Sequence, residues 1–225
     1  MEEKYRKIKE IVEKELSCSA HNMEHVKRVY NLCINLAKDE PGIDLDILKT
    51  AALLHDIARV REDKDNSGII DHSILGAEMS KKILKDLGYS EEKIEKINHC
   101  IITHRFRSEN EPITKEAKIL FDTDKLDALG SIGIVRSLII GKQYNEKIYS
   151  DIPIDEYIKD NLVDKKPNGR IKDLSKHTLK LEFELKLKKI PDRLYTKKAK
   201  KIGKQRVEFM KQFFRRLKKE INGEM

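Results

Sequence analysis

The side chains best suited to chemistry in this chain belong to His25, to the adjacent pair His55 and Asp56, and to Asp124. The pair follows the apolar run Leu53-Leu54, so it lies at the end of a predicted helix. Two neighbouring side chains of these types can bind one metal ion. Two neutral imidazoles and two carboxylates balance the charge of a divalent ion and offer mixed nitrogen and oxygen ligands. The set predicts a site for an ion such as Mn, Fe, Co, Ni, Zn or Mg and fits calcium poorly.

Three predicted helices must bring these residues together. His25 lies one turn before Val29 on the apolar side of the first helix, and His55 continues the apolar stripe of the second. Asp124 lies on the apolar stripe of the third helix, whereas Asp122 is expected on its opposite side. A buried carboxylate needs a partner, because leaving it unpaired is costly. We therefore expect the helices to aim the two histidines and the aspartates at one interior point.

Apolar residues recur at helical spacing through almost the whole chain. Gly88 is a helix-ending signal, and Ser90 begins the next helix. Only residues 180–188 alternate as a strand would. We predict a helical core over residues 1–150 and a basic helical extension over residues 151–225 that packs on the core.

The composition indicates one well-buried domain with room for an appended subdomain, since 39% of the 225 residues are hydrophobic. The three cysteines, Cys18, Cys33 and Cys100, are scattered, so neither a disulfide framework nor a thiolate zinc site is indicated. No secretory signal is readable, and the longest apolar stretch, residues 132–140, is too short to cross a bilayer. We expect a cytoplasmic protein that does not enter membranes.

The formal charge of +8 is uneven along the chain. Residues 175–225 hold 17 Lys and Arg against 6 Asp and Glu, a net charge of +11, which leaves −3 for residues 1–174. This excess could attract nucleic acid or a phosphorylated substrate. Without a recognisable nucleic-acid motif, we favour the simpler interpretation, which is a set of solvated lysine-rich helix faces.

The chain resembles the HD-domain superfamily of metal-dependent phosphohydrolases, and within it a branch of small bacterial and archaeal HD hydrolases. The resemblance rests on five segments, His25–Val29, Ala51–Ile57, His72 with Gly76-Ala77, Ile101–His104 and Asp122–Gly130. It is strong over about residues 18–141 and fainter as far as Leu217. The resemblance implies an all-α fold, an HD-domain helical bundle. It also implies that the metal ligands are His25, His55, Asp56 and Asp124.

Four other residues are candidate substrate contacts. His72 and His104 either hold a second ion, bridged to the first by Asp56, or stand over the substrate. Arg59 occupies a position where some HD hydrolases have an acid, and it could bind a substrate phosphate or form an ion pair with Glu62 or Asp63. His21 is a candidate for substrate contact or for hydrogen bonding to a metal ligand.

The chemistry that the resemblance implies is hydrolysis of a phosphomonoester or phosphodiester, with a small phosphorylated substrate, above all a nucleotide. A bound divalent ion lowers the pKa of its water and so supplies hydroxide near neutral pH. In this scheme Asp56 holds the ion, Lys125 offsets charge on the phosphoryl oxygens, and Asp127 orients a ligand or accepts a proton. The alternative is that Lys125 is solvated and Asp127 pairs locally.

Two functions of other classes stay open. A binuclear iron site on this fold supports oxygenation, so the chain could be a di-iron oxygenase. A non-catalytic module that binds nucleotide or nucleic acid through the basic C-terminal region is the other. The sequence does not indicate the metal, the exact substrate or the oligomeric state.

Overall fold

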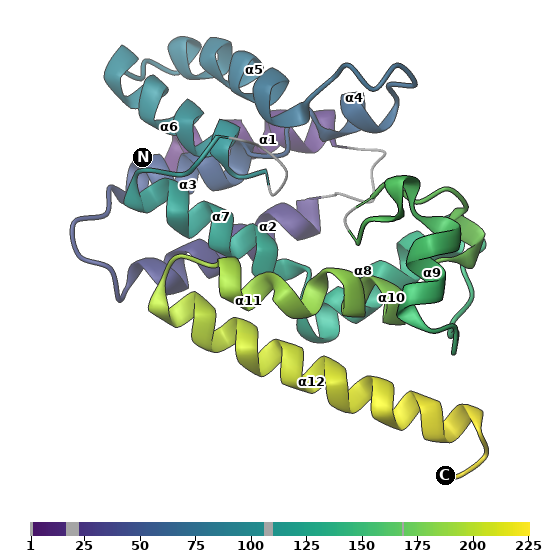
Figure 1. Ribbon diagram of the computed structural model, residues 1–225. Helices are drawn as coiled ribbons and strands as arrows, with labels where there is room; N and C mark the ends of the chain where they lie inside the picture. Colours follow the sequence, from purple (N-terminus) through teal and green to yellow (C-terminus); the bar gives the residue numbers. More distant parts are fainter. Residues whose placement is uncertain (1, 17–22, 106–109, 168) are drawn as a thin grey trace. The chain divides into compact units, whose positions relative to one another are not determined.

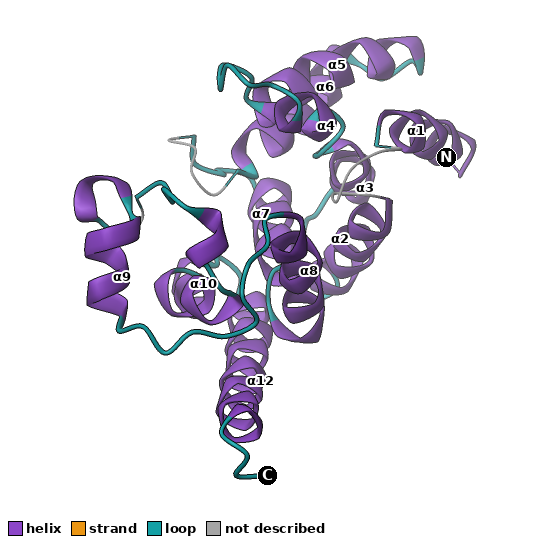
Figure 2. Cartoon of the chain, turned by 90° about the vertical axis from the view of Figure 1, so that its right-hand side faces the viewer, coloured by secondary structure: helices purple, strands orange, loops and turns teal. Residues whose placement is uncertain are grey.

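The computed structural model describes residues 2–16, 23–105, 110–167 and 169–225 (Figure 1). These residues form helices joined by loops and contain no β-strand, which confirms the predicted all-α fold (Figure 2). The chain divides into two compact units, residues 1–125 and 126–225. The predicted division of the chain at residue 150 into a core and an extension stays a prediction.

The first unit is built from six helices and most of a seventh: α1 (Glu2–Glu15), α2 (Met23–Ala37), α3 (Leu45–Leu54), α4 (Arg59–Asp63), α5 (His72–Asp86), α6 (Glu91–Thr103) and α7 (Lys115–Asp127). Helix α3 lies at the centre and packs against α1, α2 and α6, while α5 and α6 pack against each other. Side chains on all sides of α3, such as Leu48, Ala51 and Leu54, are fully buried. The helix that ends at the predicted metal ligands is therefore the best enclosed part of this unit.

Local sequence signals fix where these helices begin and end. The side chain of Asp44 caps α3 by accepting hydrogen bonds from the backbone amides of Asp46 and Ile47. Gly88 has a φ of +74°, the left-handed conformation predicted for the residue after α5. Ser90 caps α6, as its sequence position predicts. The register of the helices is set by residues that the sequence identifies.

Helix α7 differs from the expectation of one buried stripe. Asp122, predicted to lie away from the apolar side, is fully buried, and so is the next residue, Thr123. The Thr123 hydroxyl lies 3.1 Å from the thiol of Cys33 in α2. The helix is enclosed on more than one side, so periodicity alone cannot separate an inner face from an outer one.

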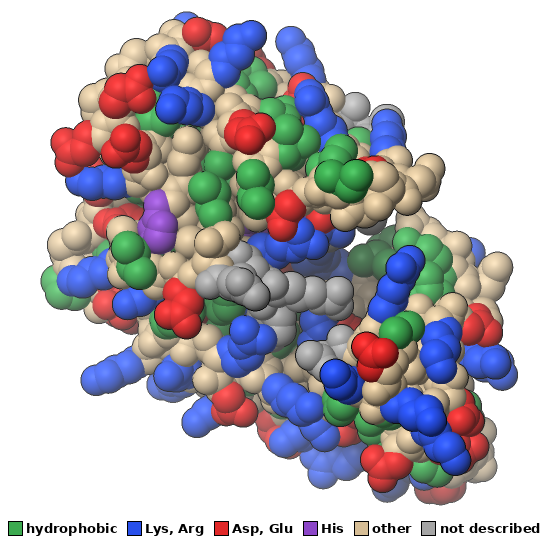
Figure 3. All heavy atoms as spheres, turned by 45° about the horizontal axis from the view of Figure 1, so that its top comes forward, with side chains coloured by type: hydrophobic (Ala, Val, Ile, Leu, Met, Phe, Trp, Pro, Cys, Tyr) green, Lys and Arg blue, Asp and Glu red, His purple; other side chains and the backbone are tan. Residues whose placement is uncertain are grey.

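The second unit contains α8 (Gly130–Gln143), α9 (Ile154–Asn161), α10 (Leu179–Leu185), α11 (Ile190–Arg193) and α12 (Lys197–Ile221), with short 3₁₀ turns at Val163–Lys165, Leu174–Lys176 and Leu187–Lys189. Helix α12 packs against α8 and α11. None of the helices in the described residues is long and apolar enough to cross a membrane. Lys, Arg, Asp and Glu side chains intermingle over the face of the protein drawn in Figure 3.

The strand predicted over residues 180–188 is wrong, because Leu179–Leu185 form α10. The alternating apolar residues are buried on two sides of this short helix. Leu181 and Leu185 join a cluster with Tyr157 of α9, whereas the ring of Phe183 contacts that of Phe214 in α12. Thr178 caps the helix through a hydrogen bond from the amide of Leu181.

Candidate metal centre

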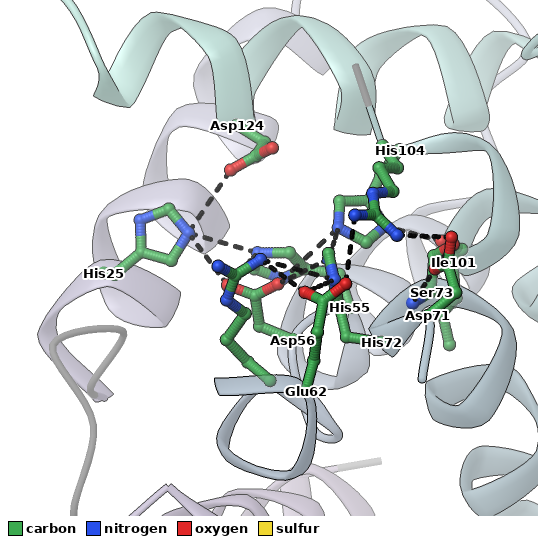
Figure 4. A network of polar contacts seen from close by, with 12 residues as sticks. His25, His55, Asp56, Glu62, Asp71, His72, Ser73, Ile101, His104 and Asp124 are labelled. Atoms are coloured by element: carbon green, nitrogen blue, oxygen red, sulfur yellow. Dashed lines mark hydrogen bonds and ion pairs between the residues drawn. The ribbon is translucent and has the colours of Figure 1, made fainter. Parts of the chain in front are cut away.

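The predicted ligands meet at the ends of α3 and α7 and in the first turn of α2 (Figure 4). The Nε2 atom of His25 lies 3.2 Å from Nε2 of His55 and 3.3 Å from Oδ1 of Asp124. The same nitrogen is 3.5 Å from Oδ2 of Asp56. Both histidines and Asp56 are buried. The structure thus brings all four predicted residues to one interior point.

The orientation of His55 is fixed by its backbone neighbours. Its Nδ1 lies 2.9 Å from the carbonyl oxygen of Ala52, which can only accept a hydrogen bond. Nδ1 must therefore carry the proton, and the lone pair of Nε2 points into the cluster. Burial, opposed only in part by the charge of Asp56, lowers the pKa of His55 to about 4. The imidazole is neutral at neutral pH, which is the form that binds metal ions.

A second group of ligand atoms adjoins the first. The Nε2 atoms of His72 and His104 are 3.2 Å apart, and they lie 3.5 and 3.6 Å from Oδ1 of Asp56. Both side chains are buried. The Nδ1 atom of His104 donates to the carbonyl oxygen of Ile101 at 2.5 Å, so its Nε2 lone pair also faces inward.

Within the described residues, two groups therefore have the spacing of metal ligands: His25, His55 and Asp56, and Asp56, His72 and His104. Two nitrogens at about 2.1 Å from one ion stand about 3.0–3.4 Å apart at octahedral to tetrahedral angles. The Nε2–Nε2 distance in each pair, 3.2 Å, falls in this range. The separations of these nitrogens from Asp56, 3.5–3.7 Å, are longer than hydrogen bonds but leave space for an ion between the atoms. The residues present fit a divalent ion, and without any thiolate they fit a borderline or hard one.

Asp124 joins the first group through His25 and is held in its ionised form. Burial alone would raise its pKa, but the charge of Lys125 and the hydrogen bond from His25 outweigh burial and keep the pKa well below its usual range. The Nζ atom of Lys125 lies 2.5 Å from Oδ2 of Asp124. Lys125 is thus paired with the predicted ligand, and its side chain is mostly buried at 12% exposure.

Arg59 adjoins the second group. Its Nη1 lies 2.8 Å from Oε2 of Glu62, and its Nε lies 3.1 Å from Oδ1 of Asp63. These are the two ion pairs that the sequence offers as the alternative to a phosphate contact. Nη1 is also 3.4 Å from Nδ1 of His72, so the guanidinium stands at the edge of the cluster.

Two candidate residues remain. Asp127 belongs to the second unit, where its Oδ2 accepts a hydrogen bond from Arg136 at 2.5 Å. His21 lies outside the described residues. Sequence analysis missed the role of Glu62, whose Oε2 is 2.7 Å from Nδ1 of His72. The sequence offered Glu62 only as an ion-pair partner of Arg59, three residues away, and this spacing does not reveal a partner on another helix.

Comparison with known proteins identifies the family to which this chain belongs. The HD domain family model matches residues 22–129, a range that contains all six clustered residues. The chain belongs to the HD-domain superfamily. An HD-superfamily hydrolase from Bacillus thuringiensis has 27% sequence identity and a TM-score of 0.70, with 98% of each chain covered.

Two other relatives are informative. YpgQ of Bacillus subtilis, an uncharacterised protein, is 28% identical over 209 residues, which are 91% of this chain and 86% of YpgQ. Its crystal structure in complex with ADP covers 97% of this chain and 98% of YpgQ, with a TM-score of 0.71 at 26% identity. The 3'-5' exoribonuclease YhaM of Bacillus subtilis is 27% identical over 140 residues, 56% of this chain and 44% of YhaM. Membership of the HD superfamily supports hydrolase activity in general terms.

Proposed function

We propose that this protein is a metal-dependent phosphohydrolase that cleaves a phosphomonoester or phosphodiester of a nucleotide. The observation that carries the proposal is the pair of buried ligand groups that share Asp56. The Nδ1 atoms of His55 and His104 donate to backbone carbonyls, so the Nε2 lone pairs of these two rings point into the cluster, where a cation would bind them. The ligand atoms of the two groups are imidazole nitrogens and carboxylate oxygens, a donor set that suits metal-assisted hydrolysis.

The nucleotide part of the proposal is supported by relatives. YpgQ was crystallised with ADP, and it matches this chain over nearly its whole length. YhaM is an exoribonuclease, so it acts on phosphodiester bonds of RNA. A nucleotide phosphate is the chemistry that these two proteins have in common.

In the proposed mechanism His25, His55, Asp56 and Asp124 would hold the ion. When bound, a divalent ion supplies a hydroxide near neutral pH and polarises the phosphoryl group. Lys125, already beside Asp124, places positive charge where the phosphoryl oxygens gain negative charge.

Other residues are proposed to contact the substrate or a second ion. His72 and His104 hold either a second ion or the substrate phosphate. Arg59 binds phosphate if it exchanges a carboxylate partner for the substrate. The ion pair of Asp127 with Arg136 favours a local structural role for this aspartate. The proposed substrate contact of His21 depends on sequence alone.

The test is elemental analysis of the purified protein beside His55→Ala, combined with hydrolysis assays on nucleoside monophosphates, nucleoside diphosphates and cyclic nucleotides in several divalent ions. We expect bound metal in the wild type and loss of both metal and hydrolysis in the variant. Protein that binds no metal and hydrolyses none of these substrates would refute the proposal and favour a binding module.

The di-iron oxygenase is the second candidate, and the bridging position of Asp56 between two histidine pairs is what favours it. The same metal analysis separates the two candidates. Iron as the bound metal, together with oxygen consumption and no hydrolysis of phosphoesters, would select the oxygenase.

A further inference from the structure

The carboxylate of Glu62 faces Nδ1 of His72, one of the clustered histidines. His55 and His104 direct Nδ1 at backbone carbonyls, those of Ala52 and Ile101. His72 instead directs Nδ1 at a carboxylate, that of Glu62, at 2.7 Å. A carboxylate partner leaves more electron density on the imidazole than a carbonyl does, and it fixes the ring at the same time.

The Glu62 carboxylate is itself held in place by arginines. Oε2 accepts a hydrogen bond from Nη1 of Arg59 at 2.8 Å, and Oε1 lies 3.0 Å from Nη2 of Arg105. Arg105 also pairs with Asp71, which caps α5 immediately before His72. The network therefore connects α4, the start of α5 and Arg105, two residues beyond the end of α6, through one carboxylate (Figure 4).

These contacts determine which nitrogen of His72 carries the proton. The Glu62 carboxylate, which has guanidinium donors on both oxygens, lies 2.7 Å from Nδ1 of His72, whereas the Arg59 guanidinium, which could only donate to this nitrogen, is farther away at 3.4 Å. The shorter contact is with an acceptor, and it favours a proton on Nδ1. The lone pair of Nε2 then faces Nε2 of His104 and Oδ1 of Asp56. In this form His72 is a ligand and cannot donate a proton from the atom that faces the cluster.

We infer that Glu62 is a positioning residue that fixes His72 with its proton on Nδ1 and so strengthens binding of a second divalent ion by His72, His104 and Asp56. The inference rests on the proposed metal site and decides between the two roles left open for His72 and His104. Carboxylate partners of metal-binding histidines typically account for a 10–100-fold effect on affinity.

The experiment uses Glu62→Gln, which keeps the size of the side chain and removes its charge. Glu78→Gln is the matched control, because Glu78 is an exposed residue on α5, the helix that begins at His72. Titration with Mn²⁺ counts the ions and measures each affinity. Histidine nitrogen NMR of the metal-free protein reports the protonated nitrogen of His72, and circular dichroism verifies that each variant is folded.

We expect two ions in the wild type and in Glu78→Gln. In Glu62→Gln the second ion should bind about 10–100-fold more weakly while the first changes by less than about twofold. The NMR signal of His72 should show the Nδ1-protonated form in the wild type and a mixture in the variant. Equal affinities in wild type and Glu62→Gln would overturn the inference, as would one ion in the wild type.

Failure of the proposed function has a different signature. A wild-type protein that binds no ion refutes the metal site and, with it, the second-ion part of the inference. The NMR measurement still tests the positioning role in that case, since it is made on metal-free protein. An unchanged His72 spectrum in Glu62→Gln would overturn that role independently.

Discussion

Asp56 occupies the most constrained position among the clustered residues, because its two carboxylate oxygens face different histidine pairs. Oδ2 lies 3.5 Å from Nε2 of His25, and Oδ1 lies 3.5 Å from Nε2 of His72. Asp124 contacts the first pair alone among the described interactions, through His25 at 3.3 Å. The two aspartates should therefore differ in what their loss does to metal binding.

We expect Asp56→Asn to remove metal from both groups and Asp124→Asn to weaken only the ion held with His25. Each loss should exceed about 100-fold in affinity, since removing a direct carboxylate ligand costs more than removing its outer partner. Elemental analysis after dialysis against a fixed low concentration of Mn²⁺ gives the number of ions. Identical metal contents in the two variants would contradict the shared position of Asp56.

Some site residues are placed by the helix period and could be predicted from the sequence, whereas others are brought together only by the fold. His25, His55 and Asp124 were identified because the helix period places them on apolar stripes, where such side chains need a partner. The family resemblance added His72 and His104, as candidates for a second ion or for substrate contact. Glu62 was missed because its partner, His72, is brought to it by the fold, and no sequence spacing encodes that approach.

At the scale of elements, most helices were predicted, and the errors fall in α7 and α10, where buried residues lie on more than one side of the helix. The cap at Asp44 and the turn at Gly88 lie where local chemistry demands them. Helix α10 was mistaken for a strand because Leu181 and Phe183, two residues apart, are both buried. A short helix that is buried on two sides has apolar residues at every second position, as a strand does. Only the tertiary contacts distinguish the two structures.

The substitution Gly133→Ala is a test in which helix propensity and tertiary packing predict opposite changes in the free energy of unfolding. Alanine is a better helix former than glycine by about 1 kcal/mol, so Gly133→Ala should stabilise α8 on propensity alone. However, a Cβ atom at this position would lie 2.2 Å from the carbonyl oxygen of Ala128, which belongs to the backbone. We expect a decrease of about 1–3 kcal/mol in the free energy of unfolding, measured with urea.

The control is Ser131→Ala, an exposed position in the same helix. This variant should leave the stability within about 0.5 kcal/mol of the wild type. A stabilised Gly133→Ala protein would show that the backbone at Ala128 relaxes at little cost.

At the scale of the molecule, charge is divided between the two units. Residues 126–225 carry 25 Lys and Arg against 14 Asp and Glu, a net charge of +11, which leaves −3 for residues 1–125. The apolar face of α12, with Val207, Met210 and Phe214, is buried, so the exposed face of this helix is mainly charged. This arrangement agrees with the interpretation of solvated lysine-rich faces.

Acid stability should depend on Glu182 in the second unit. Burial would raise the pKa of Glu182, but the hydrogen bond from His177 and the charge of Lys186 outweigh it and lower the pKa from 4.5 to about 2. Ionised Glu182 therefore stabilises the fold above pH 4.5, and this contribution is lost as the pH falls towards 2.

The variant Glu182→Gln should unfold at a lower temperature than the wild type at pH 7, and the gap should narrow towards pH 3. Thermal unfolding followed by circular dichroism at several pH values measures the gap. Glu184→Gln, which breaks an exposed pair with Lys188, serves as the control and should show a small gap that stays constant. A gap for Glu182→Gln that is independent of pH would refute this role.

The course of α7 limits where the protein can be cut. Asp124 lies in the last turn of this helix, and the carbonyl oxygen of Leu126 in the same turn accepts a hydrogen bond from Arg206 of α12 at 2.5 Å. A recombinant fragment ending at residue 129, where the family match ends, would lack that guanidinium. Helix ends with unsatisfied carbonyls fray. We expect such a fragment to retain the whole family match and yet to bind the proposed metal more weakly, so assays on it would underestimate the activity of the full chain.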